Sequence, residues 1–198
     1  MPDSPAWKEA SGKAHHLLKP LKEKIKNYSY SSLESSLLTD ERLCEYIQKS
    51  LSRSRKTLFS ISDICFSTHT GSKIISLAEK IRDELEIFSD EIHVRHCVWK
   101  DVPPDFLQKI IRQDHSLLDG IDNLVKNLES CRKSIISSIG KKPGKDFWEK
   151  IQKSLLKSKS QARDLAIQFK EREAMCNIRA IALEKTFQKM REEIRRSI

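Results

Sequence analysis

Apolar residues recur at steps of three and four along most of this 198-residue chain, which is the spacing of one face of an α-helix. The most regular run steps four, three, four and so on through Ile74, Ala78, Ile81, Leu85, Phe88 and Ile92. This heptad pattern predicts a helix from Ser72 to about Lys100. Pro103 and Pro104 then end it, because the residue before a proline is steered away from helical geometry.

Residues 1–38 form the first predicted region. Apolar positions from Trp7 to Tyr28 keep helical spacing, so a helix is expected there, with a kink or break near Lys19 caused by Pro20. The polar run from residue 27 to 36 is predicted to be a loop.

Residues 39–140 are predicted to be a three-helix antiparallel core. Its first helix is expected to begin at Thr39, a good N-cap flanked by apolar residues, and to end at Gly71. The second is the heptad helix described above. The third is expected from about Asp105 to Gly140, with Gly120 as an internal weak point worth about 1 kcal/mol against alanine.

The stretch 146–198 contains no Gly and no Pro and carries one apolar stripe throughout. As a single helix it would be about 80 Å long, at about 1.5 Å per residue. Ser158, Arg172 and Arg179 interrupt the stripe, so the first half is expected to pack in a bundle and the second half to project. Together these regions predict an all-α fold: a single domain, 1–198, forming an elongated antiparallel bundle of about five helices with a long basic C-terminal helix.

Composition narrows the function classes. Few glycines and prolines accompany 38% hydrophobic and 33% charged residues, and no glycine pair has the spacing of a phosphate-binding loop. No apolar run approaches the roughly 20 residues of a membrane span, and the N-terminus lacks the pattern of a secretory signal. Five scattered cysteines without a CxxC motif favour reduced thiols, so a cytoplasmic or nuclear location is expected.

The net charge of +9 is concentrated towards the C-terminus and suggests an acidic partner or a polyanion. Lysines at helical spacing suit phosphate contact. The candidate binding residues are Lys141, Lys142, Lys145, Lys153, Lys157, Arg172, Arg179, Arg191, Arg195 and Arg196. The alternative is a solvated basic face that binds nothing. In contrast, Glu79, Asp83, Glu86 and Asp90 form an acidic stripe that could face a basic helix in an assembly.

One cluster has the residue types of a zinc site. If the predicted hairpins pair in register from Gly71 and Pro103, Cys44 comes level with Cys97, and His115 comes level with about Asp90, close to His93. The sequence favours the simpler interpretation, a polar helix end with surface histidines. No metal, cofactor or catalytic residue is therefore predicted.

The resulting hypothesis is a non-enzymatic scaffold or adaptor module for protein–protein interaction, which binds a partner or a second copy through its C-terminal helix. The alternative is a polyanion-binding protein that contacts nucleic acid or an anionic membrane surface through the loop 141–145 and the C-terminal helix.

Overall fold

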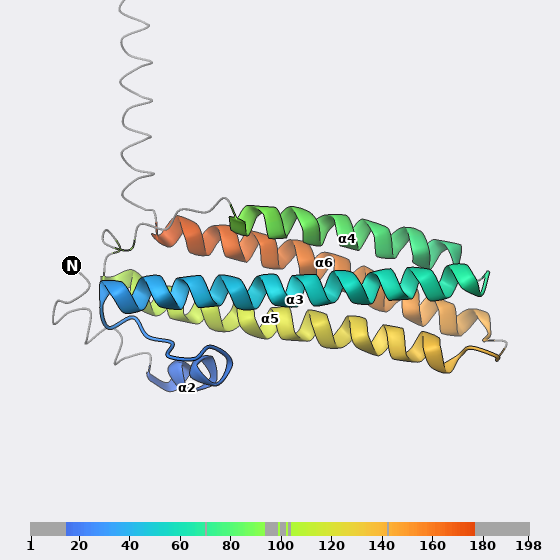
Figure 1. Ribbon diagram of the computed structural model, residues 1–198, viewed down its shortest axis with the longest axis horizontal. Helices are drawn as coiled ribbons and strands as arrows, with labels where there is room; N and C mark the ends of the chain where they lie inside the picture. The colour runs from blue at the N-terminus through green and yellow to red at the C-terminus, as the bar shows by residue number, and fades with distance from the viewer. Residues whose placement is uncertain are drawn as a thin grey trace, which may run out of the picture. The chain divides into compact units, whose positions relative to one another are not determined.

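The computed structural model describes residues 15–69, 71–93, 99, 102, 104–141 and 143–176. These residues form five α-helices, and the part of the chain that the structure describes contains no strand (Figure 1). The helices are α2 (His15–Lys24), α3 (Leu33–Ser67), α4 (Ser72–His93), α5 (Pro104–Ser137) and α6 (Lys145–Cys176). The prediction of an all-α helical bundle is confirmed.

The chain groups into two compact units. Unit 1 consists of Met1–Arg42, Arg95–His115 and Phe169–Ile198, and unit 2 consists of Leu43–Val94 and Ser116–Gln168. Helices α3, α5 and α6 contribute residues to both units.

The predicted helix starts hold for α4, and they hold to within one residue for α5 and α6. His69 after α3 and Gly140 after α5 have φ of +51° and +77°, the left-handed geometry in which helices often end. Gly71 (φ +70°) instead lies at the start of α4, where its carbonyl accepts from the N–H of Ile75 (3.1 Å). Helix α2 continues past Pro20 to Lys24, so the break expected near Lys19 is absent. Of the predicted helix 146–198, the structure describes α6, and residues 177–198 lie outside the described residues.

The start of α3 corrects the sequence prediction. The helix begins at Leu33 and not after Thr39. Ser32 and Ser35 cap it reciprocally: the backbone N–H of Ser35 donates to Ser32 Oγ (3.1 Å), and the N–H of Ser32 donates to Ser35 Oγ (2.9 Å). Thr39 has another role, because its Oγ1 accepts from the N–H of Ser29 (2.9 Å) and donates to the carbonyl of Ser29 (2.8 Å).

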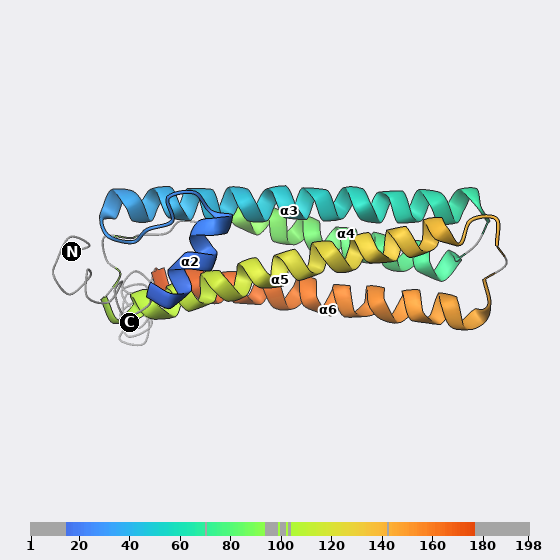
Figure 2. The ribbon, with the colours of Figure 1, turned by 90° about the horizontal axis from the view of Figure 1, so that it is seen from below.

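Unit 2 is a four-helix bundle made of the whole of α4 and parts of α3, α5 and α6 (Figures 1 and 2). Helices α3 and α4 are antiparallel, since Arg55 pairs with Glu86 and, seven residues back along α3, Gln48 pairs with His93, seven residues further along α4. Helices α5 and α6 are also antiparallel, since Asn127 pairs with Ser158 and, four residues further along α5, Cys131 pairs with Ser154, four residues back along α6.

The two hairpins pack with like-directed helices side by side. On α3 and α5, Tyr46 donates to Asp122 (2.5 Å), and seven residues further along both helices Arg53 pairs with Glu129 (2.5 Å). These two helices are therefore parallel neighbours. Helices α4 and α6 contact each other through Glu84 of α4, which accepts from Arg163 Nε (2.7 Å).

The α5/α6 pairing combines a close backbone approach with a polar cluster. A Cβ added at Gly120 would lie 2.5 Å from Leu165 Cδ2, so the glycine makes room for the leucine. The amide of Asn127 donates to Ser158 Oγ (2.7 Å) and its carbonyl accepts from Ser154 Oγ (2.9 Å). Buried polar groups that need one another fix the relative register of two helices, because a shift would leave them unpaired.

Unit 1 contains α2, the connecting segment (residues 25–32), the first residues of α3 and α5, and the last residues of α6. Leu21, Ile25, Tyr28 and Tyr30 are buried in it, and Arg42 donates to the carbonyl of Lys26.

Candidate functional site

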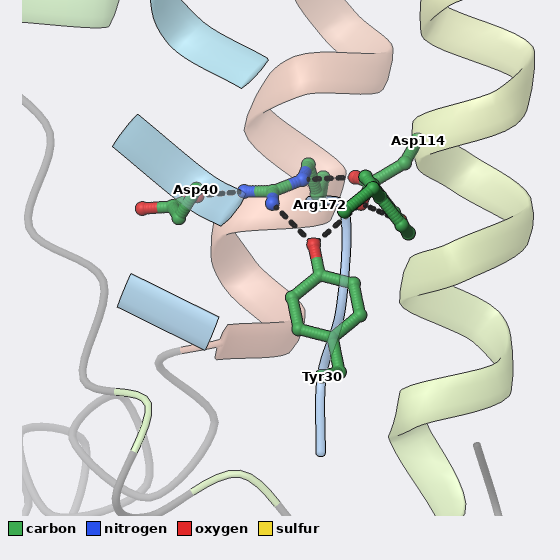
Figure 3. A network of polar contacts seen from close by, with 5 residues as sticks. Tyr30, Asp40, Asp114 and Arg172 are labelled. Atoms are coloured by element: carbon green, nitrogen blue, oxygen red, sulfur yellow. Dashed lines mark hydrogen bonds and ion pairs between the residues drawn. The ribbon is translucent and has the colours of Figure 1, made fainter. Parts of the chain in front are cut away.

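A fully buried arginine lies at the centre of unit 1. Arg172 is in the last turns of α6, and none of its surface is exposed. Its Nη1 donates to Asp40 Oδ1 of α3 (2.7 Å), and its Nε donates to Asp114 Oδ1 of α5. Figure 3 shows the guanidinium lying between these two carboxylates. Three helices are thus joined through one cation.

Two tyrosines of the connecting segment complete the cluster. The hydroxyls of Tyr28 and Tyr30 both donate to Asp114 Oδ2, each at 2.5 Å. Tyr30 also accepts from Arg172 Nη2 (3.1 Å), as Figure 3 shows. The buried carboxylate of Asp114 therefore receives three donors, which is close to the capacity of its two oxygens.

Trp99 covers the aromatic side of this cluster. Its ring stacks on Tyr30 with 4.8 Å between centroids, and the Arg172 guanidinium lies 5.7 Å from the centre of the indole. Only 1% of Trp99 is exposed. This geometry adds a cation–π contact to the ion pairs.

Burial sets the protonation of the cluster. Burial raises the pKa of the Tyr28 and Tyr30 hydroxyls well above the ordinary value, and the negative charge of Asp114 raises it further. Burial by itself lowers the pKa of the Arg172 guanidinium, but the adjacent carboxylates, Asp114 first, outweigh it and the pKa is raised. The tyrosines thus stay neutral donors and the arginine stays charged.

The cluster holds the connecting segment to three helices. Its polar groups satisfy one another in the interior, and buried ion pairs of this kind specify an arrangement more than they add stability. We therefore interpret the Arg172 cluster as structural.

This placement corrects the prediction for Arg172. The sequence predicts that it contacts a polyanion, but its guanidinium is enclosed and bonded to Asp40, Asp114 and Tyr30. Charged residues at seam positions of three helices were the signal that could have revealed the cluster. Asp114, between Ile110 and Leu117, occupies the apolar face of α5.

The remaining predicted basic residues divide into three groups. Lys153 and Lys157 are exposed on α6. Lys141 is exposed, and Lys145 is 88% exposed with Glu149 3.5 Å away. The other predicted positions lie outside the described residues: Lys142, Arg179, Arg191, Arg195 and Arg196.

Further lysines join Lys153 and Lys157 on unit 2. Lys126 of α5 and Lys157 of α6 line one groove of about 610 Å³ between these helices, together with polar side chains and Asp164. Because Cys131 faces Ser154, the exposed Lys133 lies about level with Lys153. We define the lysine face as Lys126, Lys133, Lys150, Lys153 and Lys157, all exposed.

A second surface of unit 2 is apolar. Phe59 and Phe66, seven residues apart on α3, are 62% and 72% exposed, and Arg82 of α4 lies 5.9 Å from the centre of the Phe59 ring. We define the phenylalanine face as Phe59, Phe66 and the exposed residues of α3 and α4 that lie next to them. Neither phenylalanine was predicted to be a surface residue, although both fall outside the apolar stripe of α3.

The candidate zinc ligands do not form a described cluster. Cys44 is buried on α3, the exposed His93 lies against Gln48 (3.2 Å), and His115 is half-buried on α5. Cys97 lies outside the described residues. In the described part of the chain, no three His, Cys, Asp or Glu side chains are grouped as a metal would require.

Comparison with known proteins adds no relative: no family model, curated protein or solved structure matches this chain. None of the helices described is both long enough and apolar enough to cross a membrane.

Proposed function

We propose that this chain is a non-enzymatic helical-bundle module for protein–protein interaction, acting as a scaffold or adaptor. The observation that carries the proposal is the phenylalanine face. Covering two rings that are 62% and 72% exposed would contribute about 1.5–3 kcal/mol for each fully buried side chain. Neighbouring exposed aromatic residues are typical of interaction surfaces.

Two further features support the proposal. The described cysteines Cys44, Cys65, Cys131 and Cys176 are buried and none of them is in a disulfide, which fits a module working in a reducing compartment, cytoplasmic or nuclear. The apolar stripe of α6 is buried within the protein as far as Cys176. Self-association through the C-terminal helix stays a prediction from its sequence.

Site-specific photo-cross-linking tests this function. A benzophenone amino acid would replace Phe59 or Phe66 in the cells that make the protein, with Leu156 of α6, 49% exposed, as the control position. We expect one discrete protein adduct from positions 59 and 66, weakened when the other phenylalanine is changed to serine. Equal adducts from all three positions, or none, would contradict the proposal.

The lysine face supports a second candidate, binding to polyanions such as nucleic acid or an anionic membrane surface. Its five lysines are exposed, and no described carboxylate forms an ion pair with Lys126, Lys153 or Lys157. The loop residues Lys141 and Lys145 lie at the start of the same helix α6 and extend the positive charge. Lysines clustered in this way release counterions when they contact phosphates.

Salt-dependent binding tests this candidate. Lys126, Lys153 and Lys157 would be changed to Gln, and binding to single-stranded oligonucleotide and to phosphatidylserine vesicles would be measured separately. Each lost phosphate contact should reduce the salt slope by about one. Changing Lys22, Lys73 and Lys80, exposed on α2 and α4, to Gln is the control. If both triple variants bind alike, the lysine face is only a solvated surface.

A further inference from the structure

We propose that the phenylalanine face is a two-fold interface between two copies of this chain, in which α3 of each copy lies over α4 of the other. The inference rests on the proposed function, because it names the protein that covers Phe59 and Phe66. It follows from the register of the α3/α4 hairpin, the exposure of the two phenylalanines and the charges on either side of them.

The register of the hairpin places the outward residues of α3 and α4 level with one another. Arg55 pairs with Glu86 (3.1 Å), and Arg82 lies against Phe59, four residues further along α3 and four back along α4. Seven more residues bring Phe66 level with Ile75, which is half-buried. Phe59 thus lies beside the guanidinium of Arg82, and Phe66 is level with a half-buried isoleucine.

The two helices carry opposite charges on the same outer face. The exposed stripe of α4 is acidic at Glu79, Asp83, Glu86 and Asp90, and its steps of four, three and four keep these carboxylates on one side. On α3 the exposed stripe carries Lys49 and Lys56 at one end and the two phenylalanines at the other.

Existing ion pairs at this face are weak enough to be exchanged. Lys49 pairs with Glu45 (3.2 Å) with side chains 78% and 55% exposed, and Glu86 is likewise more than half exposed in its pair with Arg55. Exposed pairs contribute about 0–1 kcal/mol, so a second copy can compete for them.

The charges select the direction of the two-fold axis. If the two-fold axis runs parallel to the helices, α3 of one copy lies over α4 of the other. Residues that are level with each other within one chain are then also level across the interface. Lys56 then faces Asp83 and Glu86 of the other copy, and Lys49 faces its Asp90. An axis perpendicular to the helices would stack the two acidic α4 stripes on each other, and like charges so juxtaposed are repulsive.

The apolar residues fit the same arrangement. With the axis parallel to the helices, Phe59 and Phe66 of each copy lie over the levels of Arg82 and Ile75 of the other. Each contact occurs twice, so the interface is closed and self-complementary, as expected for a C2 dimer.

One residue is mismatched in this interface. The exposed Asp63 lies between the two phenylalanines on α3. In the proposed interface it would lie close to Glu79 of the other copy, which carries the same charge. Charge reversal at Asp63 should therefore strengthen association, which a surface without this register would not do.

Sedimentation equilibrium of the full chain with charge-exchanged variants tests the inference. We expect Lys49→Glu with Lys56→Glu, and separately Asp83→Lys with Asp90→Lys, to weaken dimerisation at least tenfold. All four changes together should restore it to within a few-fold, and Asp63→Lys should tighten it. The matched control, Lys153→Glu with Lys157→Glu on the lysine face, should leave it unchanged. Circular dichroism would establish that each variant is folded.

Three outcomes would overturn the inference. The parent protein could remain a 23.0 kDa monomer at every concentration. The variant with all four charge changes could fail to dimerise as the parent does, although each pair of changes alone had weakened the dimer. Dimerisation could depend on Lys153 and Lys157 in place of Lys49 and Lys56, which would pair the acidic stripe with the lysine face. If the chain is monomeric while positions 59 and 66 cross-link to a different protein, the inference fails and the proposed function stands.

Discussion

At the scale of single residues, Arg172 links the most distant parts of the sequence. Its two carboxylate partners are 132 and 58 residues away along the chain, and Tyr30 is 142 residues away. A charged side chain at the seam of an apolar stripe can be either an exposed interruption or a buried partner. Whether Arg172 is exposed or buried depends on the positions of Asp40 and Asp114 on other helices. The sequence of α6 alone could therefore not predict it.

Replacing Asp114 should be strongly destabilising. Asp114→Asn removes the charge that Arg172 Nε faces and disturbs the acceptor of two tyrosine hydroxyls. Breaking a buried pair in this way costs about 3–5 kcal/mol. Urea unfolding followed by tryptophan fluorescence would measure it. The exposed Asp164→Asn is the control and should change the free energy of unfolding by less than about 0.5 kcal/mol; an equal effect of both changes would contradict the structural role.

The buried tyrosines predict a loss of stability at alkaline pH. Because burial and Asp114 raise the pKa of Tyr28 and Tyr30, the unfolded chain releases these protons first as the pH rises. Their contribution is fully present below the unfolded tyrosine pKa of about 10 and is lost as the pH rises above it. The free energy of unfolding, measured from pH 8 to 11, should fall in this window.

Tyr30→Phe provides the check on this pH dependence. It removes one titrating group and one donor to Asp114, so we expect lower stability at pH 8 by about 1–3 kcal/mol and a shallower alkaline fall. Changing the half-buried Tyr46, whose hydroxyl contacts Asp122 in unit 2, to Phe is the control. An alkaline slope that is the same in both variants would show that Tyr30 does not titrate as the cluster requires.

At the scale of helices, the heptad pattern predicted most elements because burial on one face is a local property of the sequence. The start of α4 at Ser72 and its buried face followed directly from it. The start of α3 did not, since Ser32, Ser35 and Thr39 are all plausible caps. The choice depends on Ser29, because its backbone N–H and carbonyl both form hydrogen bonds with the side chain of Thr39.

Gly120 shows how a tertiary contact reverses a helix propensity. In isolation Gly120→Ala should stabilise α5 by about 1 kcal/mol. In the bundle the new Cβ would lie 2.5 Å from Leu165 Cδ2, so we expect net destabilisation of about 1–3 kcal/mol. Thermal unfolding would measure it, with Ser130→Ala on the exposed side of α5 as the control. Leu165→Val should partly rescue Gly120→Ala; stabilisation by Gly120→Ala alone would contradict the close approach.

At the scale of the whole molecule, the sequence predicted an all-α bundle but not the surfaces that distinguish it. Lys153 and Lys157 of α6 were predicted, whereas Lys126 and Lys133 joined them only through the pairing of α5 with α6. Phe59 and Phe66 were missed because their exposure depends on which side of α3 meets the other helices. The proposed interaction function therefore depends on surfaces that the fold assembles.

The central claim is that a second copy of this chain covers the phenylalanine face, and the mass of the protein in solution tests it most directly. Sedimentation equilibrium would compare the parent with Phe59→Ser plus Phe66→Ser, and with Leu156→Ser plus Ile167→Ser as an equally apolar control on α6. We predict that the parent and the control reach twice the chain mass of 23.0 kDa at tens of micromolar, while the phenylalanine variant stays at 23.0 kDa. Three equal masses would contradict the two-copy interface.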